Sequence, residues 1–476
     1  MRKADPNPKA NRNILKLAYV MVALFLALIA YMGYFLQTKS EDVINNSYNA
    51  RLDSFADRIV RGQILASDGT VLAETQVDEA GNETRVYPFG SVYSHAVGYS
   101  TKGKTGIEAL ANFYLLTSHV NLMEQALNQM GGEKNIGDNV YTTLDPQLQQ
   151  AAYDALGDRR GAVIAMEPDT GKILAMVSKP GFDPNTIVSD WEALTAEGND
   201  QGQLLNRATQ GLYPPGSTFK IVTALEYMRE RPEDYRDFQF DCSGVYVNGD
   251  YRIKCYHGNA HGHQDFVQAF ANSCNGAFAS LGLSLDLSKF SQTAGDVLFN
   301  APLPLTGIPY KESSFAMKPG AGTWEILQTS MGQGVTQITP IHNALITAAV
   351  ANGGTLMRPY LLERVENVGG EEIRKFLPTA YGSLMTAEES KNLTELMRAV
   401  VTEGTGSGVR TDAYTVAAKT GSAEFETGKE THAWFTGFAP AEAPRIVVTV
   451  VVEEGGSGGK VAAPIARQLF DIYMSR

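Results

Sequence analysis

The longest uninterrupted apolar stretch of the chain lies close to its start. Leu17 to Leu36 is a run of twenty residues without a charged side chain, and as a helix rising about 1.5 Å per residue it spans the roughly 30 Å core of a bilayer. We therefore expect one transmembrane helix over 17–37. The alternative is a cleaved signal peptide, but its apolar run is usually about 7–15 residues, and Gln37-Thr38-Lys39 is not a small-x-small cleavage site.

Short apolar runs then alternate with turn residues. Residues 40–58 are polar and predict a helical stalk, and the two runs around Asp68-Gly69 in 61–73 predict a β-hairpin. A helical pattern follows over 106–116. These elements predict a small mixed module over 41–140.

The pattern changes near residue 145. Asp145-Pro146 is a typical helix start, with Leu148, Ala152 and Ala155 on one face, and 161–178 predicts a second hairpin. Strands are expected at 413–419, 432–438 and, strongly β-branched, 446–452, before a closing helix from 461. We predict an α/β (α+β) fold in which 145–476 forms a domain with a central antiparallel sheet flanked by helices.

Charge divides the chain at the apolar run. The whole chain carries −12, with 40 Lys+Arg against 52 Asp+Glu, which argues against a nucleic-acid partner. Residues 1–16 nevertheless sum to +4, from Arg2, Lys3, Lys9, Arg12 and Lys16 against Asp5. The positive-inside rule then predicts a cytoplasmic tail at 1–16 and an extracytoplasmic remainder carrying −16.

Two motifs match the sequences of well-known sites but lack the other residues that those sites need. Residues 98–105 spell a Walker A loop, but no convincing strand or Mg²⁺-binding Asp accompanies it, so we interpret it as a surface turn. Residues 455–459 spell the Gly-x-Ser-x-Gly elbow, whose histidine must follow the serine in sequence. The last histidine is His432, so a glycine turn is the better interpretation.

A third set of motifs is Ser-x-x-Lys, Ser-x-Asn and Lys-Thr-Gly. Each occurs more than once, so order and local structure must select among them. The alternatives are Ser457/Lys460, Ser47/Asn49, Ser390/Asn392 and the Lys-Thr-Gly at Lys104. We expect Ser390 to lie on the solvent face of a helix capped by Thr386 and Glu389.

One arrangement remains after this selection. Ser217 follows Pro214-Pro215-Gly216 and opens a buried helix, so Lys220, three residues on, points to the same place. Ser273 and Asn275 interrupt an Ala/Phe-rich helical stretch, and Lys419-Thr420-Gly421 closes the strand 414–418, which Ser422 continues. The expected order is Ser217, then Ser273, then Lys419.

With these motifs the chain resembles the penicillin-binding protein transpeptidases, specifically the monofunctional class B, short penicillin-binding protein A type. The resemblance extends over nearly everything after the tail, through RGQILASDGTVLAE, GYSTKGKTGIE, TTLDPQLQQAAYDAL, GAVIAMEPDTGKILAMVSKPGFDPN, YPPGSTFKIVTALE, GQGVTQITPIHNALITAAVANGG and AAKTGSAE. The roughly 100 residues between anchor and transpeptidase leave no room for the glycosyltransferase of the bifunctional class. The resemblance makes 41–140 a membrane-proximal dimerisation or pedestal module.

The resemblance implies acyl transfer by a serine nucleophile, cross-linking peptidoglycan stem peptides from a lipid-linked precursor. Ser217 would attack the penultimate D-Ala carbonyl, with Lys220 as base once burial and the charge of Lys419 lower its pKa. Ser273 would relay the proton, and Asn275 would hold the substrate amide and Lys220. The remaining implied roles are carboxylate binding by Lys419 with Thr420 of the Lys-Thr-Gly at 419–421, and an oxyanion hole from the N–H groups of Ser217 and Ser422.

The resemblance implies that the chain crosses the bacterial cell membrane once and that its catalytic domain lies outside the cytoplasm. Expected partners are stem peptides, β-lactam antibiotics and a SEDS-type membrane glycan polymerase; no cofactor, metal or nucleic acid is expected at the site. The alternatives are a D,D-carboxypeptidase or β-lactamase, in which water resolves the acyl-enzyme, and a non-catalytic scaffold or β-lactam sensor. The intact Lys220 and Ser273 argue against a scaffold.

The three cysteines are a separate feature. Cys242 and Cys255 lie thirteen residues apart across a predicted hairpin, on the oxidising side of the membrane, so a disulfide and free thiols are both open. A zinc site with His257, His261 and His263 is a further alternative, although the spacing matches no recognised ligand pattern. Cys274, inside Ser-x-Asn, is interpreted as a small packed residue without a reactive role.

Overall fold

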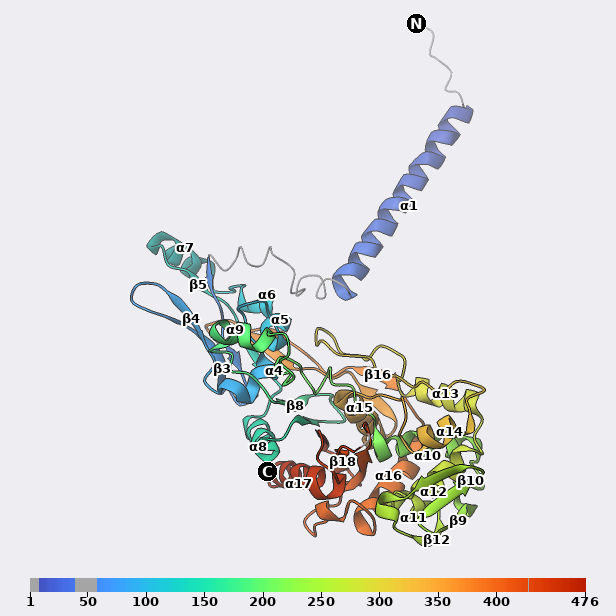
Figure 1. Ribbon diagram of the computed structural model, residues 1–476. Coiled ribbons are helices and arrows are strands. Elements are labelled where there is room, and N and C mark those ends of the chain that lie inside the picture. The colour runs from blue at the N-terminus through green and yellow to red at the C-terminus, as the bar shows by residue number, and fades with distance from the viewer. Residues whose placement is uncertain (1–7, 39–57, 427) are drawn as a thin grey trace.

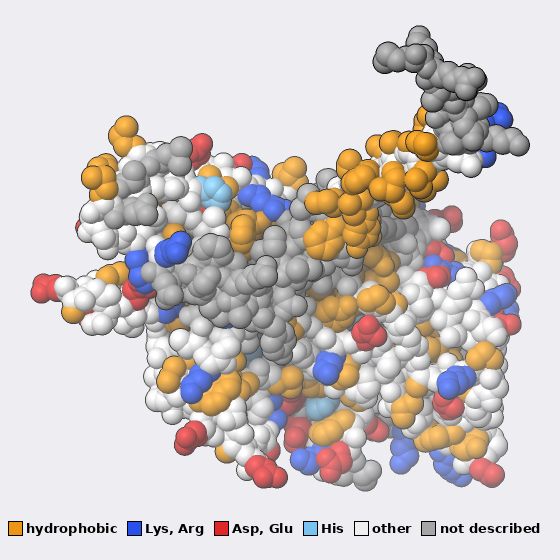
Figure 2. Space-filling view, turned by 90° about the horizontal axis from the view of Figure 1, so that it is seen from above, with side chains coloured by type: hydrophobic (Ala, Val, Ile, Leu, Met, Phe, Trp, Pro, Cys, Tyr) orange, Lys and Arg blue, Asp and Glu red, His pale blue; other side chains and the backbone are white. Residues whose placement is uncertain are grey.

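The computed structural model describes residues 8–38, 58–426 and 428–476 (Figure 1). The predicted stalk therefore lies almost entirely outside the described residues. Helix α1 (Pro8–Thr38) contains the predicted span and extends beyond it at both ends, with an apolar section at Arg12–Phe35 of mean hydropathy 2.3. The side chains of this section are not buried against the rest of the protein, and they form an exposed apolar band (Figure 2). Such a helix is compatible with membrane anchoring.

A six-stranded sheet joins residues from both predicted domains. The hairpin expected around Asp68-Gly69 is present, with Gly69 in the left-handed region at φ +89°. The strand order is β15-β14-β6-β2-β3-β4. The strands are β2 (Ile64–Leu65), β3 (Val71–Val77), β4 (Glu83–Val86), β6 (Asn139–Thr142), β14 (Leu362–Glu366) and β15 (Glu372–Lys375). Because β6 pairs with β14, the small module and the later domain share one sheet.

Short elements surround the module end of this sheet. They are β1 (Ile59–Val60), parallel to β5 (Asn135–Ile136), and η1 (Gly90–Tyr93), α4 (Ser94–Val97), α5 (Gly106–Leu110), α6 (Asn112–Leu115) and α7 (Leu122–Gly131). The helical run predicted at 106–116 is thus two short helices, α5 and α6. The Walker-like loop follows helix α4 and not a strand, so the strand–loop–helix arrangement of a phosphate site is not formed here.

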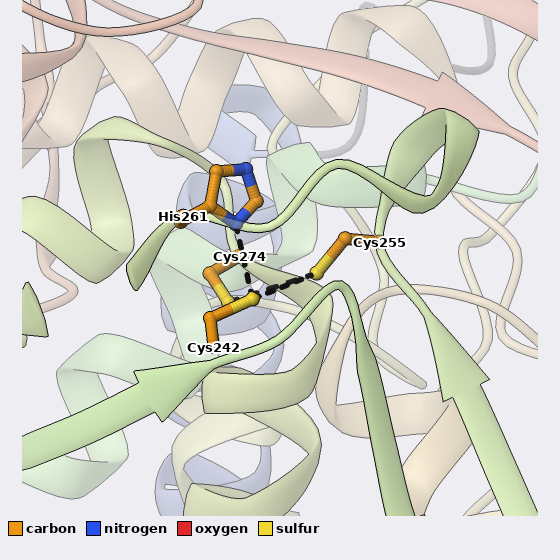
Figure 3. A group of neighbouring side chains, drawn as sticks. All are labelled: Cys242, Cys255, His261 and Cys274. Atoms are coloured by element: carbon orange, nitrogen blue, oxygen red, sulfur yellow. Dashed lines mark hydrogen bonds between the residues drawn. The ribbon is translucent and has the colours of Figure 1, made fainter. Parts of the chain in front are cut away.

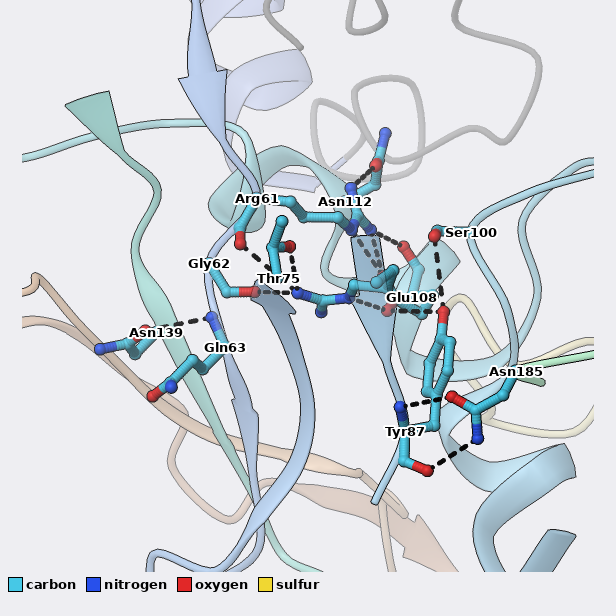
Figure 4. Close-up of polar contacts among 11 residues, drawn as sticks. Arg61, Gly62, Gln63, Thr75, Tyr87, Ser100, Glu108, Asn112, Asn139 and Asn185 are labelled. Carbon is cyan, nitrogen blue, oxygen red and sulfur yellow. Dashed lines mark hydrogen bonds and ion pairs between the residues drawn. The ribbon is translucent and has the colours of Figure 1, made fainter. Parts of the chain in front are cut away.

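A buried carboxylate holds the module together (Figure 4). Glu108 on α5 is fully buried and accepts from Arg61 Nε at 2.6 Å and from Arg85 Nε at 2.8 Å. Tyr87 donates to the same carboxylate at 3.1 Å. Burial alone would raise the pKa of Glu108, but the two guanidinium groups outweigh it and hold this pKa below its ordinary value.

We expect Glu108→Ala to lower the free energy of unfolding by about 3–5 kcal/mol, because Arg61 and Arg85 would remain buried without their shared counter-charge. Urea denaturation of the purified chain measures the loss. Glu79→Ala, at an exposed position, is the matched control. Equal stability of the two variants would contradict the structural role given to this network.

The central sheet of the later domain has five strands in the order β17-β18-β19-β7-β8. These are β17 (Ala417–Ala423), β18 (His432–Ala439), β19 (Ile446–Val452), β7 (Gly161–Met166) and β8 (Ile173–Lys179), all antiparallel to their neighbours. Side chains alternate across β19: Val447 and Val451 belong to one core, and Ile446, Val448, Val450 and Val452 belong to another. Helices therefore cover both faces of the sheet.

Helix α15 (Pro340–Ala351) contributes to the first core, and α8 (Pro146–Leu156) and α17 (Ala463–Met474) contribute to the second. The predicted start of α8 is confirmed, since the Asp145 side chain accepts from Leu148 N at 2.9 Å. The predicted hairpin at 161–178 and the strands near 432–438 and 446–452 are also confirmed. The predicted α/β (α+β) class with a flanked antiparallel sheet is therefore correct.

A largely helical region lies beside the β17 edge and supplies the remaining site residues. Its helices are α10 (Lys220–Glu230), α11 (Phe266–Ala271), α12 (Asn275–Gly282), α13 (Leu287–Asp296), α14 (Thr323–Ser330) and α16 (Ala387–Thr402), with α9 (Ile187–Thr195) packed elsewhere near the module. The tighter turns are η2 (Gly216–Phe219), η3 (Tyr235–Asp237), η4 (Tyr256–Gly258), η5 (Ser407–Val409) and the π-turn η6 (Gly458–Ala462). Short strand pairs are β9 (Gln239–Cys242) with β12 (Gly262–Asp265), β10 (Val245–Asn248) with β11 (Tyr251–Lys254), and β13 (Thr355–Met357) with β16 (Ala380–Ser383).

Two local predictions are wrong. The strand expected at 413–419 begins at Ala417 and continues to Ala423, so Lys419 lies inside it and does not close it. Thr415 bonds the Glu442 carboxylate and Ala441 N, which holds the preceding residues out of the sheet. Ser390 does not face solvent: the capping box of Thr386 and Glu389 is present, but the Ser390 hydroxyl is buried and donates to Val350 O at 2.7 Å.

Candidate active site

Ser217 lies on a tight turn that faces the edge of the central sheet. The turn η2 precedes α10, so Ser217 is one turn before the α-helix and not its first residue. Gly216 has φ +54°, and a Cβ there would come within 2.9 Å of Ala423 on β17. Glycine is therefore required for the turn to approach the strand so closely. Ser217 itself is partly exposed.

Lys220 begins α10 and is fully buried. Its Nζ donates to Asn275 Oδ1 at 2.8 Å, to Ser273 O at 2.7 Å and to Ser273 Oγ at 3.3 Å. Burial lowers the pKa of Lys220 to about 8, because the charged ammonium loses its hydration. At neutral pH a substantial fraction of this amine is therefore unprotonated.

The Ser-x-Asn segment forms the turn between α11 and α12, as predicted. Ser273 adopts φ +56°, a left-handed conformation that is uncommon for serine and costs energy unless its surroundings hold it. Asn275 Nδ2 donates to Lys254 O at 3.0 Å, which fixes the amide oxygen toward Lys220. The strained turn thus presents two polar groups to one buried amine.

Lys419 approaches the same turn from β17. It is fully buried, and its Nζ donates to Ser273 Oγ at 2.9 Å and to Thr420 O at 3.1 Å. Burial lowers the pKa of Lys419 well below its ordinary value, and the positive charge of Lys220 lowers it further. Ser273 Oγ therefore bridges two lysines that belong to different elements.

Strand β17 is an edge strand, and its free side faces the Ser217 turn. Ser422 O accepts from Gln333 Nε2 at 3.4 Å, so the peptide groups of Ser422 point away from β18. A Cβ on Gly421 would lie 3.3 Å from Ser217 N, which places this strand directly against the backbone of the turn. The side chains of Thr420 and Thr405 share a hydrogen bond of 2.7 Å.

The structure brings the predicted residues together, with two differences. Lys220 and Ser273 are hydrogen-bonded, but no described residue makes a hydrogen bond to the Ser217 hydroxyl. Burial and the charge of Lys419 were both expected to lower the pKa of Lys220; burial does lower it, but the repulsion between the two amines acts on the pKa of Lys419 instead. Ser273 bonds both Lys220 and Lys419, and the Ser217 turn lies against β17 at Gly421.

Three neighbouring residues were not anticipated. Gln333 bonds both Ser422 O and Glu424 N, Thr405 bonds Thr420, and Gly458 N donates to the Ser422 hydroxyl at 3.4 Å. Only glycine fits at 458, since a Cβ would lie 2.4 Å from Gly421 O. The loop at 455–459 is therefore packed against the Lys-Thr-Gly strand. Its glycine-rich sequence was the one feature that could have indicated this close packing.

None of the rejected motifs has a described hydrogen bond to Lys220 or Ser273. Ser47/Asn49 lies outside the described residues, and Lys104 lies in the loop after α4. Ser457 and Lys460 belong to the packed glycine loop and its π-turn. Their local backbone is a strand-to-helix connection, and no helix such as α10 begins at Ser457.

The distances between side chains reduce the alternatives for the cysteines, which were a disulfide, free thiols and a zinc site. Cys242 and Cys255 are free thiols with their sulfurs 3.6 Å apart, so no disulfide joins them. His261 Nδ1 lies 3.4 Å from Cys242 Sγ, but His263 pairs with Asp241 and His257 is exposed. Cys274 is buried and packed as expected, but its sulfur also lies 3.7 Å from that of Cys255.

Two family models match the chain. The penicillin binding protein transpeptidase domain matches residues 161–471, and the penicillin binding protein A dimerisation domain matches residues 61–140. One match lies within each of the two regions that the sequence pattern predicts. The second match contains β2, β3, β4 and the start of β6 of the six-stranded sheet, and the short helices around them.

Relatives match over most of the chain. The peptidoglycan D,D-transpeptidase PbpA of Mycolicibacterium smegmatis is 33% identical over 96% of this chain and 98% of its own. Penicillin-binding protein A from Mycobacterium tuberculosis, solved as a ceftriaxone acyl-enzyme complex, is 31% identical with a TM-score of 0.79 over 88% of this chain and 99% of that chain. A D,D-transpeptidase domain from Eggerthella lenta gives 32% identity and a TM-score of 0.78, over 88% and 99% of the two chains. The chain therefore belongs to the penicillin-binding protein transpeptidases, and within them to the monofunctional penicillin-binding protein A type.

Proposed function

We propose that this chain cross-links peptidoglycan through an acyl-enzyme on Ser217. Ser217 Oγ attacks the carbonyl carbon of the penultimate D-Ala of a stem peptide, and the bond to the terminal D-Ala breaks. An amine of a second stem peptide then attacks the ester, releases Ser217 and completes the cross-link. The observation that supports these roles best is the convergence of Lys220, Ser273 and Lys419 beside the Ser217 turn.

Lys220 serves as the base. At its ordinary pKa of 10.5, about one amine in 3,000 is neutral at pH 7, whereas a pKa of about 8 makes about one in ten neutral. The gain of roughly 300-fold in the reactive form is what burial supplies. Asn275 and Ser273 hold the amine beside the turn that carries Ser217.

Ser273 relays the proton to the leaving amine. Its hydroxyl is 3.3 Å from Lys220 Nζ and 2.9 Å from Lys419 Nζ, so it can accept from one lysine while it donates to the substrate. Lys419 and Thr420 bind the substrate carboxylate. Although burial lowers the pKa of Lys419, an arriving carboxylate stabilises the protonated form.

The free edge of β17 receives the substrate. An extended peptide can add to an edge strand through main-chain hydrogen bonds, and the outward peptide groups of Ser422 offer one such pair. The N–H groups of Ser217 and Ser422 form the oxyanion hole, because Gly421 lets the strand lie against the turn. A β-lactam would acylate Ser217 through the same contacts.

We expect the rate of acylation by a β-lactam to rise about tenfold per pH unit below pH 8 and to level off above it, since the neutral form of Lys220 is the reactive one. The sign follows from the lowered pKa: raising the pH removes a proton from the base. Labelling rates with a fluorescent penicillin across a pH series measure the profile. A rate that falls over this interval, or stays flat, would exclude Lys220 as the base.

The chain crosses the bacterial membrane once through α1 with a cytoplasmic N-terminus, supported by the basic tail and the apolar section at Arg12–Phe35. The module at 61–140 is a membrane-proximal pedestal or dimerisation unit. The lipid-linked precursor is polymerised by a SEDS-type membrane glycan polymerase partner, because no second catalytic domain fits between anchor and transpeptidase. Co-purification of such a polymerase with the detergent-solubilised full chain tests this partnership.

A further inference from the structure

All three cysteines of the sequence meet one histidine beside the Ser-x-Asn turn (Figure 3). Cys242 ends β9, Cys255 follows β11, His261 precedes β12, and Cys274 is the N-cap of α12. The sulfur atoms and a ring nitrogen all lie within 4.8 Å of one another. Four segments separated in sequence therefore direct soft donor atoms at one point.

The distances match those of a tetrahedral metal site. Cys242 Sγ and Cys255 Sγ are 3.6 Å apart, Cys255 Sγ and Cys274 Sγ are 3.7 Å apart, and His261 Nδ1 is 3.4 Å from Cys242 Sγ. Zinc bonds of about 2.3 Å to sulfur and about 2.0–2.1 Å to nitrogen, at tetrahedral angles, place two sulfurs about 3.8 Å apart and sulfur and nitrogen about 3.5 Å apart. A disulfide would instead require about 2.05 Å between sulfurs.

The chemistry of the donors selects the metal. Thiolates and imidazole favour zinc over magnesium or calcium, which prefer oxygen ligands. Cys242, Cys255 and Cys274 are all buried, and together with Ala269 and Ala277 they form a small core against Phe238 and Phe240. Four protein donors in such an enclosed position leave no open site for a substrate, which is typical of structural zinc. We propose that Cys242, Cys255, His261 and Cys274 bind one structural Zn²⁺ ion.

The ion would join the Ser-x-Asn turn to the segment before it. Residues 239–265 form two short strand pairs, β9 with β12 and β10 with β11. Isolated two-stranded hairpins are marginally stable in water. Bonds from Cys274 and from the three other ligands to one shared ion would anchor both pairs to the start of α12, in addition to the hydrogen bond from Asn275 Nδ2 to Lys254 O.

Metal analysis of the full chain tests the site independently of any enzymatic activity. The chain is purified in detergent under reducing conditions, supplied with Zn²⁺ and freed of excess ion. We expect one zinc per chain, and a loss of affinity in Cys242→Ser and His261→Gln larger than the roughly 10–100-fold that an outer-sphere change costs. The control His263→Gln, whose partner is Asp241, is expected to retain the ion. A chain that binds no zinc, or cluster variants that bind it as tightly as the unaltered chain, would overturn the proposal.

Two measurements on the unaltered chain remain informative if a variant fails to fold. Co²⁺ substitution is expected to give the intense visible absorption of a tetrahedral thiolate site, and an octahedral spectrum would contradict the assignment. Removal of zinc by a chelator is expected to speed amide hydrogen exchange in 239–265 and 272–277, with little change in β18 and β19. Exchange that does not change in those segments would exclude the structural role.

Discussion

Replacing Ser217 by alanine is expected to abolish covalent labelling of the chain by a fluorescent penicillin. The acyl bond forms on the Ser217 oxygen, and alanine offers no atom in its place. The fold should be unaffected, because the hydroxyl makes no hydrogen bond to a described residue. Labelling followed on a denaturing gel measures the effect, and the melting temperature confirms that the variant is folded.

The chain supplies its own control for this change. Ser457 begins the second Ser-x-x-Lys and is also partly exposed, but it lies in the glycine loop before η6. Ser457→Ala is expected to label as the unaltered chain does. Persistent labelling of Ser217→Ala, or its loss in Ser457→Ala alone, would mean that the nucleophile has been assigned to the wrong motif.

Replacing Lys220 by methionine is expected to slow acylation by about 10²–10⁴-fold, the usual contribution of a general base. Methionine nearly matches the length of lysine and removes an amine whose charged form is costly to bury. The cost is that Asn275 Oδ1 and Ser273 O lose a donor. Single-turnover acylation rates, measured together with thermal unfolding, separate a catalytic loss from a loss of structure.

The matched control is Lys460→Met, in the second motif, which should leave the acylation rate unchanged. The pH profile adds a readout that misfolding cannot imitate. The residual acylation by Lys220→Met should lose the rise toward pH 8 that the unaltered chain shows. A variant that keeps both its rate and its rise would rule out Lys220 as the base.

Motif order and local context were sufficient to predict much of the site. The prolines before Ser217, the interruption at Ser273 and the strand context of Lys419 are all visible in sequence, and the structure brings these residues together. The local sequence pattern could not predict the hydrogen-bond partners of Lys220. Lys220 bonds Ser273 and Asn275, 53 and 55 residues away, and burial lowers its pKa, whereas the expected effect of Lys419 on this pKa is not found.

The two wrong local predictions, the exposure of Ser390 and the start of β17, depend on tertiary contacts. The capping box at Thr386 was correctly predicted, but the face on which Ser390 lies is set by its bond to Val350 O on α15. Before β17 begins, Thr415 bonds Ala441 N and the Glu442 carboxylate in the segment that follows β18. A strand pattern alone contains neither contact.

Pairing between strands that are far apart in the sequence could not be predicted either. Strand β6 of the small module pairs with β14, more than 200 residues later, so one sheet crosses the predicted boundary at 140–145. The cysteine cluster has the same origin. Cys274 was interpreted only as part of Ser-x-Asn, because nothing in its spacing from Cys255 and His261 indicates that the two strand pairs fold back onto the start of α12.

The most direct test of the account is the fate of the acyl group. The full chain is incubated with a D-Ala-D-Ala pentapeptide donor, with and without an acceptor stem peptide that carries a free amine, and the products are separated by mass. The expected result is a cross-linked product that forms only with the acceptor, matches the D-Ala released, and is absent for Ser217→Ala. D-Ala release at the same rate with and without acceptor, yielding only hydrolysed tetrapeptide, would contradict transpeptidation and identify a carboxypeptidase.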